Sequence, residues 1–318
     1  YHDRIRESGL GALSSEDTLG YHLKLGRVLS KRNKSAGWLF DAVRHLGAAA
    51  SLLEAPAERR AAAAIHADAG ELAQDGAAFP LAFSCFEAGI ALLPEDAWQS
   101  DYSLALRLHT GAVEAAYLSA NWSALEERSA QVKAHSRSVM DQLVAWETEI
   151  DAYAGRQEFD RAIDTGLSVL AMLGVDLPHH PEEAEVRKAV EQALARLTEV
   201  GPEGVRALPD LDDPRVAAAT RIQVRLSPVA YFGRPMLLPL IASGLVTTSI
   251  DRGVSTATPY ALALFGIILN TAELFPTSHA WGKLALELLD RWPDRRLEAA
   301  IRHILANLVC CWLEIGRA

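Results

Sequence analysis

The sequence predicts an all-α fold made of antiparallel helix hairpins. Half of its 318 residues are hydrophobic, and alanine and leucine outnumber the β-branched residues that favour strands. Apolar residues recur at helical spacing, and no segment shows the sustained alternation of a strand. Caps and breakers divide the chain into about fifteen helices joined mostly by short turns.

Local signals place the ends of several helices. Segment 14–32 opens with serine, carries Asp and Glu in its first turn and ends in basic residues, as a helix does. Pro56 and Gly76 bound a second helix, and Pro181 and Gly201 bound another. Segment 201–214, "GPEGVRALPDLDDP", is rich in Gly, Pro and Asp, so we expect an irregular joint there.

One pattern of large and small residues recurs along the chain. It is clearest in "FPLAFSCFEAGIALLP", which begins at Phe79. Small residues follow Trp122, Phe159 and Phe275 at similar spacings. Small residues at these positions let paired helices approach closely, and aromatic residues fill the space between hairpins. The residues assigned to this packing are Gly70, Phe79, Ala82, Phe86, Gly89, Trp122, Trp146, Tyr153, Phe159, Ala162, Gly166, Gly266, Phe275 and Gly282.

The pattern resembles the tetratricopeptide repeat, in which helix hairpins of about 34 residues stack as a right-handed superhelix. Gly70 and Gly266 each lie twelve residues before a small residue of the following helix. Trp146 and Tyr153 fit the aromatic positions of a first helix. Phe232 lies 43 residues before Phe275, so we expect it to head another hairpin.

Particular strings extend the resemblance to one family. "YHDRIRESGLGAL", "HLKLGRVL", "FDAVRHL", "LSPVAYFGRP" and above all "LGVDLPHHPEEAEV" are similar to the middle region of large bacterial signalling proteins. Those proteins join a serine/threonine kinase, a STAND/AAA-type ATPase, a helical repeat region and the sensor histidine kinase of a two-component system. The resemblance implies a helical adaptor at 1–54, after an ATPase module absent from this sequence. A repeat domain would follow at 55–318, with a possible joint near 201–213.

The resemblance carries no catalytic residues with it. The chain has no G-x-x-x-x-G-K-[ST] phosphate loop and no H-R-D or D-F-G kinase motif. It therefore implies a non-catalytic regulatory or scaffold segment without a cofactor. Such a segment would bind a protein or small ligand in a groove and relay its occupancy to neighbouring domains. The alternative is the helical arm of an ATPase-type transcription activator.

Two short motifs offer other chemistry. "DLDD" at 210–213 resembles the protonating motif of class II terpenoid cyclases, in which clustered carboxylates could keep one of their number neutral. The competing interpretation is an exposed loop that caps the helix starting near Pro214. "PHHPEE" at 178–183 lacks the usual spacing of His ligands, so an exposed linker is favoured over a metal site.

Charge and composition exclude further classes. The formal charge of −10 argues against a nucleic-acid-binding surface. Window 253–272 is uncharged but contains Ser, Thr, Pro and Asn, which favours a buried helix over a membrane span. Three cysteines, Cys85, Cys310 and Cys311, form no disulfide framework, so a reducing cytoplasmic location is expected.

The last segment predicts self-association. Residues 294–317 are expected to form the first helix of a hairpin whose partner helix is missing. An uncovered apolar face could pair with a second copy, and the candidate contact residues are Ile304, Leu308 and Trp312.

Overall fold

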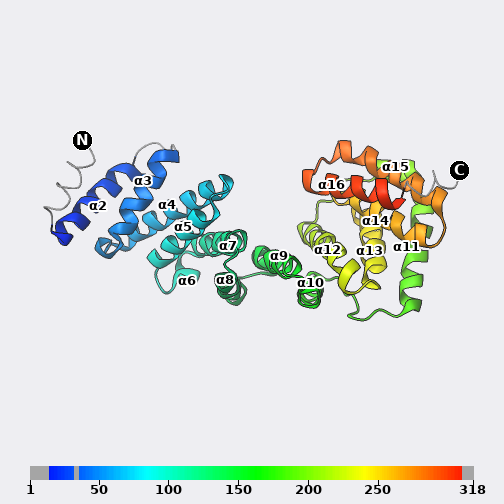
Figure 1. Ribbon diagram of the computed structural model, residues 1–318, viewed down its shortest axis with the longest axis horizontal. Coiled ribbons are helices and arrows are strands. Elements are labelled where there is room, and N and C mark those ends of the chain that lie inside the picture. Colours follow the sequence, from blue (N-terminus) through cyan, green and yellow to red (C-terminus); the bar gives the residue numbers. More distant parts are fainter. Residues whose placement is uncertain (1–13, 32–35, 310–318) are drawn as a thin grey trace. The chain divides into compact units, whose positions relative to one another are not determined.

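The computed structural model describes residues 14–31 and 36–309, and every regular element in this part of the chain is a helix. The predicted all-α fold is therefore confirmed (Figure 1). The described residues divide into two compact units, with the division between Thr148 and Glu149. This is a different place from the boundary predicted after residue 54, which stays a prediction.

The first unit is a succession of helices that pack against their neighbours in sequence. Its helices pair mainly as α2 with α3, α4 with α5, α5 with α7, and α7 with α8. They are α2 (Ser15–Ser30), α3 (Ala36–Ala48), α4 (Pro56–Asp75), α5 (Phe79–Leu92), the short α6 (Ala97–Ser100), α7 (Tyr102–Leu118), α8 (Trp122–His135) and the start of α9 (Val139–Gly155).

The second unit continues from the end of α9. Its helices are α10 (Phe159–Leu173), α11 (Glu183–Ala207), α12 (Pro214–Gly233), α13 (Leu237–Arg252), α14 (Thr258–Thr271), α15 (Phe275–Arg291) and α16 (Arg295–Ile304), followed by a π-helical turn at Leu305–Val309. Here α10 packs against α12, while the intervening α11 packs against α13. Four helices, α11, α12, α13 and α14, thus lie between α10, which begins at Phe159, and α15, which begins at Phe275.

Capping side chains fix several helix starts where the sequence predicts them. The Ser14 hydroxyl accepts a hydrogen bond from the Asp17 amide at 3.1 Å, and Pro56 occupies the first turn of α4. The Asp213 carboxylate accepts from the amides of Arg215 and Val216 at the start of α12. Each device satisfies or removes an amide that has no partner within the helix.

The hairpins share one turn conformation. Among the described residues, the non-glycine residues with positive φ are Ala77 (56°), Ala120 (56°), Gln157 (61°) and Glu273 (60°). Each lies two positions before the first residue of α5, α8, α10 or α15. In each turn the following amide bonds to the carbonyl five residues earlier, as from Ala78 to Ala73 at 2.8 Å. This is the Schellman ending of a helix, repeated at all four turns.

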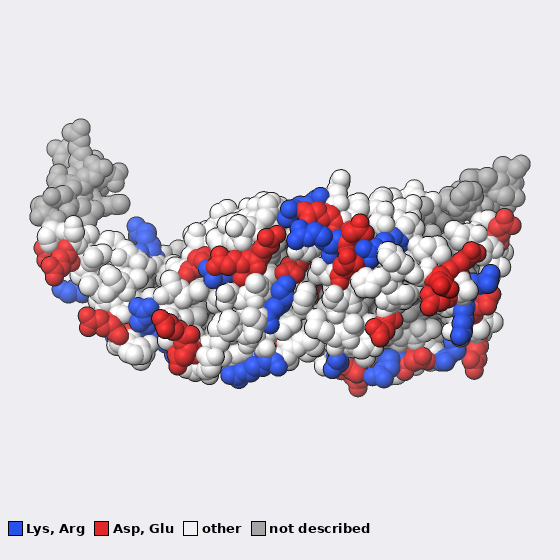
Figure 2. Space-filling view, turned by 90° about the horizontal axis from the view of Figure 1, so that it is seen from below, with Lys and Arg blue, Asp and Glu red and all other residues white. Residues whose placement is uncertain are grey.

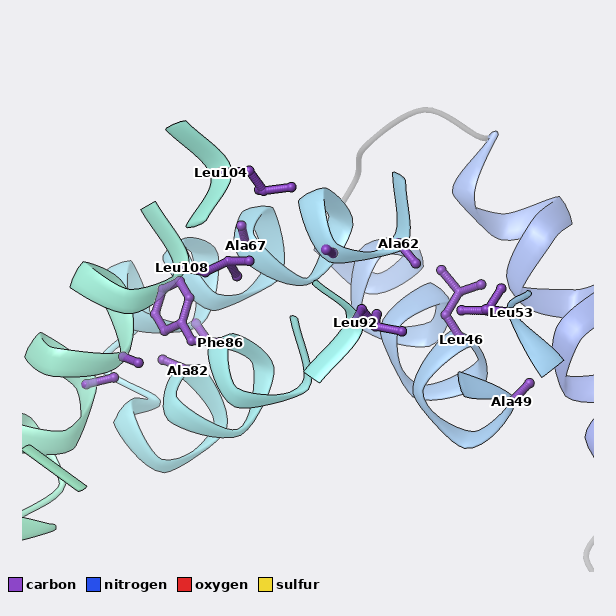
Figure 3. Close-up of a cluster of buried hydrophobic side chains, with 14 of the residues drawn as sticks. Leu46, Ala49, Leu53, Ala62, Ala67, Ala82, Phe86, Leu92, Leu104 and Leu108 are labelled. Carbon is purple, nitrogen blue, oxygen red and sulfur yellow. The ribbon is translucent and has the colours of Figure 1, made fainter. Parts of the chain in front are cut away.

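Close packing in the first unit centres on the ring of Phe86, which is fully buried (Figure 3). A Cβ atom on Gly70 of α4 would lie 2.6 Å from this ring, and one on Gly111 of α7 would lie 2.5 Å from it. A Cβ atom on Gly89 would lie 2.5 Å from the Leu108 side chain. Together with the fully buried Ala82, these glycines lie where α4, α5 and α7 approach one another.

Comparable contacts occur in the second unit. A Cβ atom on Gly166 would lie 2.5 Å from Leu226, and one on Gly282 would lie 2.8 Å from Leu305. The Ser278 hydroxyl donates to the carbonyl of Gly266 at 2.9 Å, which joins α15 to α14. These small residues therefore mark close helix contacts in both units.

Two details of the sequence prediction are wrong. Segment 201–207 is helical: Gly201 adopts φ 66° and ψ 168°, which kinks α11, and helical structure then continues from Pro202 to Ala207. Phe232 does not head another hairpin, because it lies at the end of α12, which runs to Gly233, and α13 begins only at Leu237. Its ring stacks instead on Phe159, with ring centroids 5.9 Å apart.

We expect Gly70→Ala to lower the free energy of unfolding by about 1–3 kcal/mol, because the added methyl group has no room beside Phe86. Gly20→Ala is the matched control in α2, where nothing lies within 4 Å of an added Cβ, and it should stabilise by up to about 1 kcal/mol. Urea denaturation followed by circular dichroism measures both. Equal effects of the two substitutions would contradict the packing described.

The shared turn predicts opposite effects for one substitution at two alanines. Ala120→Gly removes the strain that a Cβ atom causes in the left-handed conformation, so it should raise the free energy of unfolding by about 0.5–1 kcal/mol. Ala130→Gly, at an exposed position inside α8, should lower it by about 1 kcal/mol. The comparison uses urea midpoints of the two variants. Destabilisation by Ala120→Gly would show that the alanine side chain is needed in the turn.

Candidate ligand-binding pocket

An open apolar pocket lies in the second unit, between α12, α13, α14 and α16. Its volume is about 370 Å³. Figure 1 shows these helices together in that unit. Its walls include Ser227, Tyr231 and Phe232 of α12, Tyr260 and Leu264 of α14, and His303 and Ile304 of α16.

Helical spacing brings the wall residues together. Ser227 and Tyr231 are four residues apart on α12, as are Tyr260 and Leu264 on α14, so each pair lies on one face of its helix. The Ile304 side chain contributes from α16 and is only 8% exposed. Each helix therefore presents a short stripe of side chains to the same space.

Two aromatic side chains at the pocket are unusually exposed. Phe232 is 68% exposed and Tyr231 is 54% exposed. Their rings meet edge to face, with centroids 5.1 Å apart. Exposed apolar surface is unfavourable in water. Its presence beside a cavity is therefore typical of a site that a ligand covers.

Two polar side chains, Ser227 and Tyr260, belong to the pocket wall. The Ser227 hydroxyl donates to the main-chain carbonyl of Gln223 at 2.9 Å. Burial raises the pKa of Tyr260 above its ordinary value. The phenol is therefore neutral at physiological pH.

The lining has no fixed charge. None of the residues that line this pocket is Asp, Glu, Lys or Arg. The ion pair nearest in sequence, Arg302 with Glu298 at 2.8 Å, joins two exposed side chains of α16. The pocket therefore offers apolar and aromatic contacts with a small number of neutral polar groups.

The DLDD string does not have the surroundings that acid catalysis needs. Asp212 is exposed, and Asp210 pairs with Arg291 at 3.1 Å. Asp213 caps α12 and pairs with Arg252 at 2.9 Å. The hydrogen bond from the Val216 amide is the main cause that lowers the pKa of Asp213. An acid catalyst would instead need a raised pKa, which keeps the carboxyl group neutral.

The histidines of "PHHPEE" are both exposed, and His179 pairs with Asp164 at 3.2 Å. Within residues 14–31 and 36–309, no group of three or more His, Cys, Asp or Glu side chains is arranged to hold a metal ion. These two motifs therefore supply local structure in the described chain.

Buried titratable groups in the first unit are held in their neutral forms. Burial lowers the pKa of His66 to about 4, and neither nitrogen of its ring has a hydrogen-bond partner in the described chain. Burial, followed by the charge of Arg128, lowers the pKa of His109 to about 4, and the ring of His109 packs 4.9 Å from that of Trp98. Burial also raises the pKa of the Cys85 thiol to about 11, so this cysteine is no thiolate nucleophile.

Trp122, Trp146 and Tyr153, which the sequence assigned to repeat packing, are partly buried and contact neighbouring side chains. Tyr153 lies under the Arg161 guanidinium at 4.1 Å, and Trp146 lies under the Lys133 amine at 4.3 Å. Trp122 packs against Tyr117. These contacts are structural, and none of these residues lines the pocket.

The residues proposed for self-association are placed only in part. Ile304 is buried within the second unit, since the apolar face of α16 turns toward α14, and it is not an exposed contact as the sequence suggested. The side chain of Leu308 and all of Trp312 lie outside the described residues. Dimerisation through this segment stays a prediction.

Sequence reasoning missed the pocket, although one feature pointed to it. The adjacent aromatic residues Tyr231 and Phe232 stand at a helix end, where one apolar face cannot bury both. The residues that complete the pocket come from α14 and α16, more than 25 positions further along the chain.

Comparison with family models, curated proteins and solved structures finds no match to this chain. None of the helices in the described residues is both long and apolar enough to span a membrane. On the face shown in Figure 2, basic and acidic side chains are intermixed. Many of the arginines pair with carboxylates, such as Arg128 with Glu87 at 2.7 Å.

The buried histidines predict a pH-dependent stability. Because the pKa of His66 and of His109 is lowered on folding, the unfolded chain binds more protons below about pH 6.5. The free energy of unfolding should therefore fall as the pH drops from 6.5 to 4, by on the order of 3 kcal/mol for each group.

Urea denaturation at a series of pH values measures this slope. His66→Leu and His109→Leu should each reduce the slope between pH 6.5 and 4, while His180→Gln, at an exposed position, should leave it unchanged. A slope that is the same in all four proteins would contradict the assignment.

Proposed function

We propose that the chain is a non-catalytic helical-repeat module that binds a ligand and regulates a larger bacterial signalling protein. The observation that supports this best is the open apolar pocket of the second unit, with exposed Tyr231 and Phe232 at its edge. Pockets of this kind, mostly apolar with a few placed polar groups, are typical of small-molecule sites.

The helices that form the pocket also suit the proposed relay of occupancy. Its walls come from α12, α13, α14 and α16, so a ligand that touches several of them would stabilise one arrangement of these helices over others. Two of these helices also pack on helices outside the pocket, α12 on α10 and α13 on α11, so a change at the pocket would alter those pairs as well. Neighbouring domains of the same polypeptide would receive that change.

The signalling context comes from the sequence resemblance. The strings around "LGVDLPHHPEEAEV" are similar to the regulatory region between the ATPase and the sensor histidine kinase of such proteins. In that setting the module is cytoplasmic, and the kinase and ATPase reactions belong to other domains. The proposal therefore assigns recognition, and no chemical step, to this chain.

A fragment screen tests the proposal. In ligand-observed NMR, small apolar fragments should bind the wild-type chain, and Ala300→Trp, which fills the pocket from α16, should remove most of that binding. Ala299→Trp is the matched control, because the neighbouring Ala299 is exposed and does not line the pocket. ATP should give no binding heat in calorimetry, since the chain lacks a phosphate loop.

Two results would overturn the proposal. One is fragment binding that Ala300→Trp and Ala299→Trp affect equally, which would place the binding elsewhere. The other is micromolar ATP binding at a defined site, which would point to a nucleotide-dependent function.

A further inference from the structure

We propose that the second unit holds a second ligand site, which takes a small, neutral molecule that joins a carboxamide group to an apolar body. The site is a cavity of about 330 Å³ between the end of α10, the first half of α12 and the end of α13. We call it the amide pocket, and its walls include Val216, Ala219, Thr220, Gln223 and Thr248. Its lining residues all differ from those of the apolar pocket, so the proposal goes beyond the function assigned there.

Helical spacing builds the amide pocket. Val216, Thr220 and Gln223 follow one another at intervals of four and three residues, so they lie on one face of α12. Thr248 and Arg252, four residues apart, line the same cavity from α13. Because α12 packs on both α10 and α13, the three lining segments surround one space.

The side chain of Gln223 is the feature that points to a ligand. Gln223 is 3% exposed, and its Oε1 atom has no hydrogen-bond partner among the described residues. Its amide lies toward α13, since a Cβ atom on Gly244 would be 3.9 Å from both Oε1 and Nε2. Arg215 and Arg252 of the same lining are exposed, so Gln223 forms the inner end of the cavity. A buried acceptor without a donor destabilises the free protein, and a ligand that supplies the donor removes that cost.

The charged side chains of the amide pocket already have partners within the protein. The Asp213 carboxylate accepts from the Arg252 guanidinium at 2.9 Å and from the Arg215 amide at 2.9 Å. The Arg215 guanidinium donates to the main-chain carbonyls of Met172 and Leu173, the latter at 3.1 Å. A charged ligand would compete with these partners and lose its own hydration, so the pocket favours a neutral one.

A carboxamide on the ligand matches the Gln223 side chain. Each amide carries an N–H donor beside a carbonyl acceptor, so two amides that meet edge to edge can form two hydrogen bonds. A ligand carboxylate would set only acceptors against Oε1, and a ketone would leave Oε1 unpaired. Val175, Val216 and Ala219 offer apolar contacts to the rest of the ligand. The volume is near the lower end of the roughly 300–1,000 Å³ found for ligand sites, which suits a molecule of one or two rings.

NMR titration of the whole chain with nicotinamide and with 3-acetylpyridine tests the proposal. The two molecules have the same outline, but 3-acetylpyridine carries a methyl group in place of the amide NH2. We expect nicotinamide to bind at least about fivefold more tightly, because only nicotinamide supplies a donor to Oε1. Nicotinate, with a carboxylate on the same ring, should bind more weakly than nicotinamide.

Substitutions locate the effect. Gln223→Met keeps the length of the side chain and removes its amide, so it should abolish the preference for nicotinamide. It should also raise the thermal midpoint of the free chain by about 2–4 °C, because no buried acceptor is left unpaired. Gln192→Met, at an exposed position of α11 that does not line the pocket, is the matched control and should change neither property. Ala300→Trp, which fills the apolar pocket, should leave nicotinamide binding unchanged.

Three results would overturn the proposal. Equal affinities of nicotinamide and 3-acetylpyridine in the wild-type chain would show that no donor is required. Tighter binding of nicotinate would indicate an anion site at the two arginines. A preference for nicotinamide that persists in Gln223→Met, with the variant folded by circular dichroism, would place the amide contact elsewhere. Each result leaves the function proposed for the apolar pocket intact.

Discussion

The contact on which the first unit depends is the ring of Phe86 between two glycine backbones. The ring fills the space that side chains at Gly70 and Gly111 would otherwise occupy, so α4, α5 and α7 meet around one aromatic group. A larger residue at either glycine would overlap the Phe86 ring, and a smaller residue in place of Phe86 would leave a void. Both changes destabilise a close-packed interior. The surrounding alanines, several of them fully buried, extend the same close approach along the helices (Figure 3).

The hairpin turns add a second constraint, because they fix how each pair of helices begins. A left-handed residue at Ala77, Ala120, Gln157 and Glu273 reverses the chain with the same hydrogen bonds each time. A common turn gives the paired helices a common geometry, so the same small positions meet in each hairpin. Non-glycine residues in this conformation are held there by the packing of the helices on either side.

The candidate site arises where the second unit departs from simple repetition. Helix α11 lies between α10 and α12 in sequence but packs on α13, and α10 meets α12 directly. Phe232, at the end of α12, stacks on Phe159 of α10 and stays largely exposed. The pocket beside it combines apolar and aromatic walls with a few neutral polar groups, a combination typical of ligand sites.

The sequence by itself determined the helical class, most helix ends and the small residues that meet in the hairpins. These features depend on local chemistry: Ser14, Pro56 and Asp213 act on amides within a few residues of themselves. Tertiary structure alone decided that α10 packs on α12 and not on α11, the helix that follows it in sequence. It also decided that Gly201 bends a helix where the sequence suggested a loop. It also decided the pocket, because Ser227, Tyr260 and Ile304 are distant in sequence and only the packing of α12, α14 and α16 brings them to one cavity. Caps and periodicity act over a few residues, whereas the choice of helix partners depends on how whole apolar faces fit together.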